Sequence, residues 1–147
     1  MKIYLAAPYS RKDEINKYAA ELRAGGVIVT SSWLEEPHKP NTQMQDLAHD
    51  IHQGYAVQDV KDVAAADSLI LWTDPTKSII RQGRTAELGI WIGLNHARHR
   101  HAPVFVVGLE DENIFHHCPE VSHFESWEQV RDLVLDLTGP RVPQSRP

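Results

Sequence analysis

Short runs of apolar residues alternate along this chain with longer segments in which apolar residues recur every three or four positions. The short runs predict strands at Lys2–Ala6, Val27–Thr30, Ser68–Trp72 and Pro103–Gly108, with a further short hydrophobic segment at Val121–Phe124. The helical periodicity predicts helices at Arg11–Ala24, Leu47–Ala66, Thr85–Ala97 and Trp127–Leu137. Ser10 and Ser126 stand where the first and last of these helices would be capped.

Strands that alternate with helices at this spacing are typical of βαβ units, which place parallel strands in one sheet. The chain has 147 residues, the usual size of one domain. We therefore predict a single Rossmann-like (flavodoxin-like) α/β domain over residues 1–138, with a mostly parallel sheet of about five strands flanked by helices. Leu34–Gln45 and Thr73–Gly83 are expected to be loops, and residues 139–147, with three prolines, a flexible tail.

In open parallel sheets, ligands bind beyond the carboxyl ends of the strands. Four stretches of this chain are expected at that edge: Ala6–Arg11, Thr30–Trp33, Trp72–Glu87 and Gly108–Asn113. No G-x-G-x-x-G motif follows the first strand, which argues against a dinucleotide-dependent dehydrogenase.

Charge and composition narrow the classes of partner. The net charge of -5 argues against a protein that binds a nucleic acid polymer, because such proteins gather Lys and Arg on one face. Cys118 is the only cysteine, so no intramolecular disulfide forms, which is compatible with a reducing compartment. No run approaches the roughly 20 apolar residues of a membrane span, and the start of the chain reads as a strand rather than a signal peptide. We expect a cytoplasmic protein.

The segment from Gly83 to Gly89, with the sequence GRTAELG, is the sharpest chemical feature. It is expected to place Glu87 in the first turn of a helix, at the ligand-binding edge of the sheet. The helix N-terminus favours the ionised carboxylate by roughly 0.3–1 kcal/mol, and an ionised carboxylate is suited to act as a nucleophile. Acidic residues are also common in first turns for dipole reasons alone, so both interpretations stay open at this point.

An ordered set of features over about residues 2–108 resembles the nucleoside 2-deoxyribosyltransferase superfamily, which includes the 2'-deoxynucleoside 5'-phosphate N-hydrolases. The set consists of Tyr4 in the first strand, the acidic helix segment 58–62 (QDVKD), the third-strand segment 65–71 (AADSLIL) and the segment 85–89 (TAELG). The resemblance implies that Glu87 is the nucleophile, that Asp59 assists sugar binding or proton handling, and that Tyr4 orients the glutamate. It also implies a glycosyl-enzyme ester, which water or a second base resolves, as in retaining glycosidases.

The resemblance extends to the loop after the first strand. Ser10 and Arg11 resemble the residues that receive the 5'-phosphate in the nucleotide hydrolases, and a Ser and an Arg at a helix N-terminus suit an anion. The alternative is that Ser10 only caps the helix and Arg11 is only a solvated charge. Gly83 and Arg84 are also expected to contact the substrate. Trp33 could stack on a nucleobase, or equally be a core or subunit contact.

The sequence departs from the family in the loop before the glutamate. Transferases of the family contact the nucleobase with an acidic residue before the glutamate, but residues 79–82 here read IIRQ. A residue that the family takes from a neighbouring subunit would fall near Glu120. The resemblance implies a homo-oligomer, a dimer or higher, whose interface Trp91 could help to bury.

No metal or cofactor is expected. The nine histidines form neither HExxH nor a zinc-spaced Cys/His set, and Cys118 has no identifiable activating partner. The leading hypothesis is an enzyme that cleaves or exchanges the N-glycosidic bond of a small nucleoside or its 5'-monophosphate. Transfer and hydrolysis differ only in what resolves the ester. A non-catalytic nucleotide-sensing module and an NAD-cleaving domain are the rival hypotheses.

Overall fold

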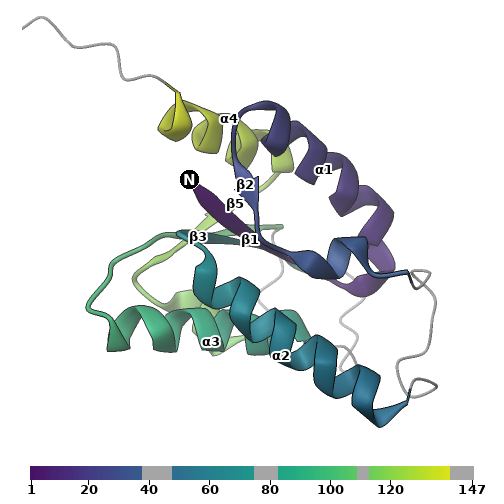
Figure 1. Cartoon of the computed structure of the whole chain (residues 1–147). Helices are drawn as coiled ribbons and strands as arrows, with labels where there is room; N and C mark the ends of the chain where they lie inside the picture. Colours follow the sequence, from purple (N-terminus) through teal and green to yellow (C-terminus); the bar gives the residue numbers. More distant parts are fainter. Residues whose placement is uncertain (38–47, 75–82, 109–112, 140–147) are drawn as a thin grey trace, which may run out of the picture.

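The computed structural model describes residues 1–37, 48–74, 83–108 and 113–139. In these residues five parallel strands form one sheet in the order β2-β1-β3-β4-β5 (Figure 1). The strands are β1 (Lys2–Ala6), β2 (Ile28–Val29), β3 (Ser68–Trp72), β4 (Val104–Val107) and β5 (Val121–Phe124). This is the flavodoxin-like order, so the predicted fold class is confirmed.

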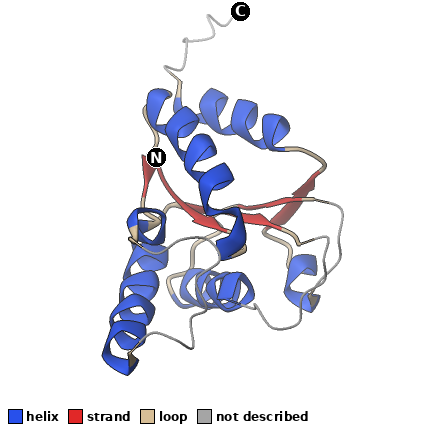
Figure 2. Cartoon of the chain, turned by 90° about the vertical axis from the view of Figure 1, so that its right-hand side faces the viewer, coloured by secondary structure: helices blue, strands red, loops and turns tan. Residues whose placement is uncertain are grey.

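Two pairs of helices cover the two faces of the sheet. The helices are α1 (Lys12–Ala24), α2 (His49–Ala65), α3 (Gly83–Ala97) and α4 (Trp127–Thr138). Helices α1 and α4 lie on one face and α2 and α3 on the other (Figures 1 and 2). The connections that the structure describes contain three short 3-10 helices, η1 (Tyr9–Arg11), η2 (Ser32–Glu35) and η4 (Ile114–His117).

Strand β3 is the centre of the core. All five of its residues are buried, as expected of an apolar strand that has a helix layer on each side. On the α1 and α4 face, Trp72 packs against Tyr18 and Trp127, with ring centroids 5.8 and 5.7 Å away. On the opposite face, Tyr4 of β1 extends toward α2 and α3, and its hydroxyl lies within hydrogen-bonding distance of Asp59 and Glu87 on these helices. Because neighbouring side chains of a strand point to opposite faces, the sheet separates the Tyr4 hydroxyl from the aromatic cluster around Trp72.

Most elements agree with the hydrophobic pattern. Strands β3 and β5 have the predicted bounds, and Ser126 forms the predicted cap, with Gln129 completing a capping box. The cap predicted for α1 was wrong, because Ser10 lies inside η1 and Arg11 takes the N-cap position without a side-chain cap. The predicted loops Leu34–Gln45 and Thr73–Gly83 are described only at their ends, where Leu34 and Glu35 belong to η2 and Gly83 begins α3. Residues 38–47, 75–82, 109–112 and 140–147 lie outside the described part of the chain. Within the described part, none of the helices is long and apolar enough to span a membrane.

Candidate active site

Three side chains from three elements meet on the α2 and α3 face of the sheet. Tyr4 from β1 is fully buried, and its hydroxyl donates a 2.8 Å hydrogen bond to Oε1 of Glu87 on α3. The same hydroxyl lies 3.5 Å from Oδ1 of Asp59 on α2. The structure therefore brings together the three residues that the sequence singled out as the catalytic group.

Helix α2 is held in place by the carboxylate one turn after Asp59. Asp62 is buried and accepts hydrogen bonds from the backbone N–H of Ser32 at 2.8 Å and from its hydroxyl at 2.5 Å. Gln58 donates a third bond to Asp62 at 2.7 Å. Asp59 and Asp62 share one helix face, as their spacing predicts. Asp62 anchors α2 to the chain after β2, and this contact helps to hold Asp59, on the same helix, next to Tyr4.

The Glu87 carboxyl is in a strongly desolvated place. Burial raises its pKa to about 8, helped by the negative charge of Asp59, while the Tyr4 hydrogen bond and Arg84 act in the opposite direction. The sequence predicted that Glu87 is ionised and that it lies in the first turn of its helix. Both parts of this prediction are wrong. Helix α3 begins at Gly83, so Glu87 lies in its second turn, and desolvation outweighs the weak helix-dipole effect.

Asp59 is more acidic than Glu87, although its pKa is also raised. Burial, followed by the negative charges of Glu36 and Asp62, raises the pKa of Asp59 to about 6, and the Tyr4 hydrogen bond opposes this rise. Burial and the two carboxyl groups also raise the pKa of Tyr4 well above its usual value, so its phenol stays protonated. Between about pH 6 and 8 the two carboxyls thus hold one proton between them, with the Tyr4 hydroxyl bridging them.

A buried lysine near this group was not foreseen from the sequence. Lys12 is 5% exposed, and its ammonium donates to the backbone carbonyl of Glu36 and to the Tyr9 hydroxyl at 3.5 Å. Burial and the Glu36 charge raise the pKa of Tyr9 to about 12. Glu36, whose negative charge also raises the pKa of Asp59, lies three residues after the stretch Thr30–Trp33 that was expected at the carboxyl end of β2. The only sequence signal for either residue was this closeness to the ligand-binding edge.

The predicted phosphate-binding residues are arranged differently from the expectation. Arg11 forms a two-pronged ion pair with Glu14, at 2.7 Å from Nε and 2.8 Å from Nη2, and donates to the Thr73 carbonyl at 3.3 Å. The positive charge of Arg11 is therefore already balanced inside the chain. Ser10 is exposed on η1. The structure does not gather these two residues around the Tyr4 hydroxyl.

The other predicted binding residues fall into two groups. Trp33 is 6% exposed, and its Nε1 donates to the Leu5 carbonyl at 2.9 Å, so its ring packs in the core rather than offering a face for stacking. Gly83 is exposed and Arg84 is buried, both at the start of α3. Arg84 acts on Glu87 through its charge, which favours the ionised form of that carboxyl.

The remaining sequence interpretations concern structural residues. Asp67 accepts a 2.8 Å hydrogen bond from the backbone N–H of Lys2. Trp91 is 2% exposed within its own chain, so it is a core residue and not an open interface contact. Glu120 pairs with His96 at 3.1 Å. In the described residues no cluster of His, Cys, Asp and Glu suits a metal ion, and the segment 79–82 lies outside them.

Comparison with known proteins supports the fold at this point. Neither the protein-family models nor the curated proteins include a match to this sequence. Among solved structures, the chain is similar to a 2-deoxyribosyltransferase from Bacillus psychrosaccharolyticus, with a TM-score of 0.65 and 21% identity over 92% of this chain and 96% of that one. It is also similar to BcmB, the Clostridium botulinum CMP N-glycosidase, with a TM-score of 0.55 and 13% identity over 93% and 99% of the two chains. The chain thus has the α/β fold of enzymes that act on N-glycosidic bonds, as the resemblance in its sequence implied.

Proposed function

We propose that this protein cleaves or exchanges the N-glycosidic bond of a nucleoside, with Glu87 as nucleophile and Asp59 as the proton carrier. The observation that carries the proposal is the Tyr4 hydroxyl placed between the two carboxyl groups, 2.8 Å from one and 3.5 Å from the other. The fold likeness to a 2-deoxyribosyltransferase and to a CMP N-glycosidase agrees with this chemistry.

The bridge explains how a carboxyl with a raised pKa becomes a nucleophile. In one protonation state Glu87 carries the shared proton, and the Tyr4 hydroxyl donates to ionised Asp59. If the Glu87 proton passes to Tyr4 while the Tyr4 proton passes to Asp59, the charge moves to Glu87 without leaving the pair. The partly buried site keeps bulk water from taking the proton, because the transfer stays within one hydrogen-bonded chain.

The reaction then balances within this group. A Glu87 oxygen forms a bond to the anomeric carbon as the carbon–nitrogen bond breaks, and the bond's electron pair leaves with the base. Protonated Asp59 gives its proton to the departing base. In the second half, ionised Asp59 takes a proton from water, or from the N–H of a second base. The oxygen or nitrogen so activated attacks the same carbon, and Glu87 is released.

A nucleoside 5'-monophosphate is the second candidate substrate. The likeness to a CMP N-glycosidase favours it, and Arg11 lies in the loop beyond β1. The pairing of Arg11 with Glu14 argues for the unphosphorylated nucleoside, because an arriving phosphate would have to compete with a carboxylate held at 2.7 and 2.8 Å. We therefore rank the nucleoside first.

The decisive experiment follows release of the free base by chromatography. A panel of ribo- and deoxyribonucleosides and their 5'-monophosphates is incubated with the protein, with and without a second base. We expect turnover that Glu87→Gln abolishes, and a glycosyl adduct on the Glu87 peptide in mass spectra of the quenched enzyme. Glu35→Gln is the matched control, because this exposed glutamate pairs only with Arg23 in the described residues.

The outcomes separate the rival functions. A new nucleoside formed in the presence of a second base identifies a transferase, and release of base alone identifies a hydrolase. Binding of nucleotides without any turnover would identify a sensing module and would overturn the proposal. Release of nicotinamide from NAD, with no action on nucleosides, would overturn it in favour of an NAD-cleaving domain.

A further inference from the structure

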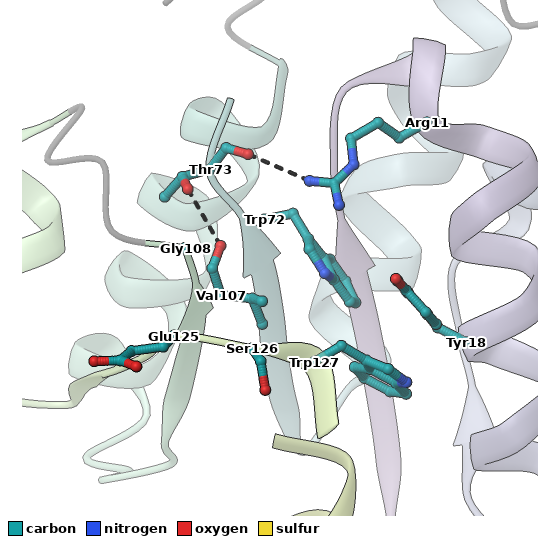
Figure 3. A pocket seen from close by; sticks show the side chains of 9 residues that line it. All are labelled: Arg11, Tyr18, Trp72, Thr73, Val107, Gly108, Glu125, Ser126 and Trp127. Carbon is teal, nitrogen blue, oxygen red and sulfur yellow. Dashed lines mark hydrogen bonds between the residues drawn. The ribbon is translucent and has the colours of Figure 1, made fainter. Parts of the chain in front are cut away.

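A cavity lies on the opposite face of the sheet from Tyr4, Asp59 and Glu87. Its volume is about 230 Å³, and it opens between α1, the start of α4 and the carboxyl ends of β3 and β4 (Figure 3). Tyr18, Trp72 and Trp127 form an aromatic wall on one side, and Val107 and Gly108 lie across from them. None of the three candidate catalytic residues lines it.

Trp72 carries a buried donor at this cavity. The residue is 1% exposed, and its indole Nε1 has no hydrogen-bond partner among the residues that the structure describes. The neighbouring Trp127 differs, because its Nε1 donates to Glu21 at 3.1 Å. In Figure 3 the nitrogen of Trp72 lies on the side of the ring turned toward Val107, and both residues line the cavity. An indole N–H can only donate, so a ligand that satisfies it must offer an acceptor.

The charges around the cavity argue against an ionic ligand. The Arg11 guanidinium at the rim is paired with Glu14, and the Tyr18 hydroxyl donates to the same carboxylate at 2.8 Å. The Glu125 side chain extends away from the aromatic wall (Figure 3). The cavity therefore combines an indole donor and an aromatic wall with the polar side chains of Thr73 and Ser126, and the charge of Arg11 at its rim is balanced by Glu14.

We infer that this cavity binds an uncharged planar heterocycle with a hydrogen-bond acceptor on its edge, which receives the Trp72 indole N–H. A flat ring suits the space between the aromatic wall and Gly108, the residue that follows β4. The volume lies below the about 300 Å³ at which pockets for drug-sized ligands begin, which suits a single small ring system. The choice of free nucleobases as probes rests on the proposed function; the cavity itself does not.

The test follows the indole N–H signals of ¹⁵N-labelled protein by NMR. The four tryptophans give separate signals, and Trp72→Phe identifies the one of interest; if that variant does not fold, Trp33→Phe, Trp91→Phe and Trp127→Phe assign it by elimination. Adenine and cytosine are titrated in turn, with inorganic phosphate and benzoate as anionic probes. We expect a saturable downfield shift of the Trp72 signal with a base and none with either anion. In calorimetry Trp72→Phe should weaken base binding about three- to tenfold, the effect of losing one hydrogen bond.

Trp91 is the internal control, because its indole nitrogen is also buried without a described partner. It lies on α3, one turn after Glu87, and does not line the cavity. A shift of the Trp91 signal alone would place the base at the candidate active site and overturn the inference, as would a Trp72 response to the anions only or to no probe. The titration is repeated in Glu87→Gln. A Trp72 response in a wild-type protein that turns over no nucleoside would sustain the second site while the proposed function fails.

Discussion

Replacing Tyr4 with phenylalanine isolates the bridging hydroxyl, because the ring stays in the core while one oxygen is removed. That oxygen donates to Glu87 at 2.8 Å and lies 3.5 Å from Asp59. Its loss breaks the only proton path between the two carboxyls that the described residues provide. It also removes a hydrogen bond that lowers the pKa of Glu87, so that pKa rises further above about 8.

The size of the effect follows from the bond that is lost. A hydrogen bond to a charged group contributes about 1.5–3 kcal/mol. Because each pKa unit, or tenfold change, corresponds to about 1.36 kcal/mol, the population with ionised Glu87 and protonated Asp59 should fall about tenfold to a hundredfold. We expect kcat/KM to fall by the same factor.

The assay measures initial rates of base release across pH 5 to 9, beside thermal unfolding of both proteins. Ser68→Ala is the matched control, since its buried hydroxyl donates a bond of equal length, 2.8 Å to the Pro103 carbonyl, and Ser68 pairs with Ile3, so its side chain points to the face opposite Tyr4. The control should keep wild-type activity. Wild-type kcat/KM in a folded Tyr4→Phe protein would refute the bridge, and so would an equal loss in Ser68→Ala.

Three further predictions follow from the same group of residues. Activity should follow a bell-shaped pH profile with limbs near the pKa values of about 6 and about 8, because below the lower value no carboxylate is ionised and above the upper value no proton is left for the departing base. A profile that rises steadily to pH 9 would contradict this. The native state holds the Glu87 proton up to about pH 8, whereas the unfolded state releases it near 4.5, so this carboxyl makes stability fall as pH rises between those values. Denaturant titration should find Glu87→Gln more stable than wild type by on the order of 4 kcal/mol at pH 8 and nearly equal at pH 4, and a constant difference would speak against the buried carboxyl. Asp62→Ala should lower the free energy of unfolding by about 1–3 kcal/mol, because the Ser32 N–H and hydroxyl lose their acceptor, and a neutral effect in urea unfolding would show that α2 is anchored elsewhere.

Periodicity alone determined the architecture of this protein. The apolar run Ser68–Trp72 could only be a strand covered on both faces, and the alternation of such runs with amphipathic helices requires parallel strands with helical crossovers. The same pattern assigned Tyr4 to the first strand and Asp59 and Glu87 to two helices, with Glu87 at the carboxyl edge. Only the family resemblance singled out Asp59. Their meeting followed from topology, because the carboxyl ends of parallel strands share one edge.

The protonation of the site was decided by the tertiary structure. Sequence position suggested an ionised Glu87, yet burial by residues distant in the chain and the charge of Asp59 raise its pKa to about 8. Tertiary structure also decided the role of Trp33, whose indole N–H donates to the Leu5 carbonyl in the core. It decided the role of Arg11 as well, whose guanidinium pairs with Glu14 and donates to the Thr73 carbonyl. Desolvation and hydrogen-bond partners depend on which surfaces meet after folding. Local sequence determines which side chain is present, and packing determines its charge and its partners.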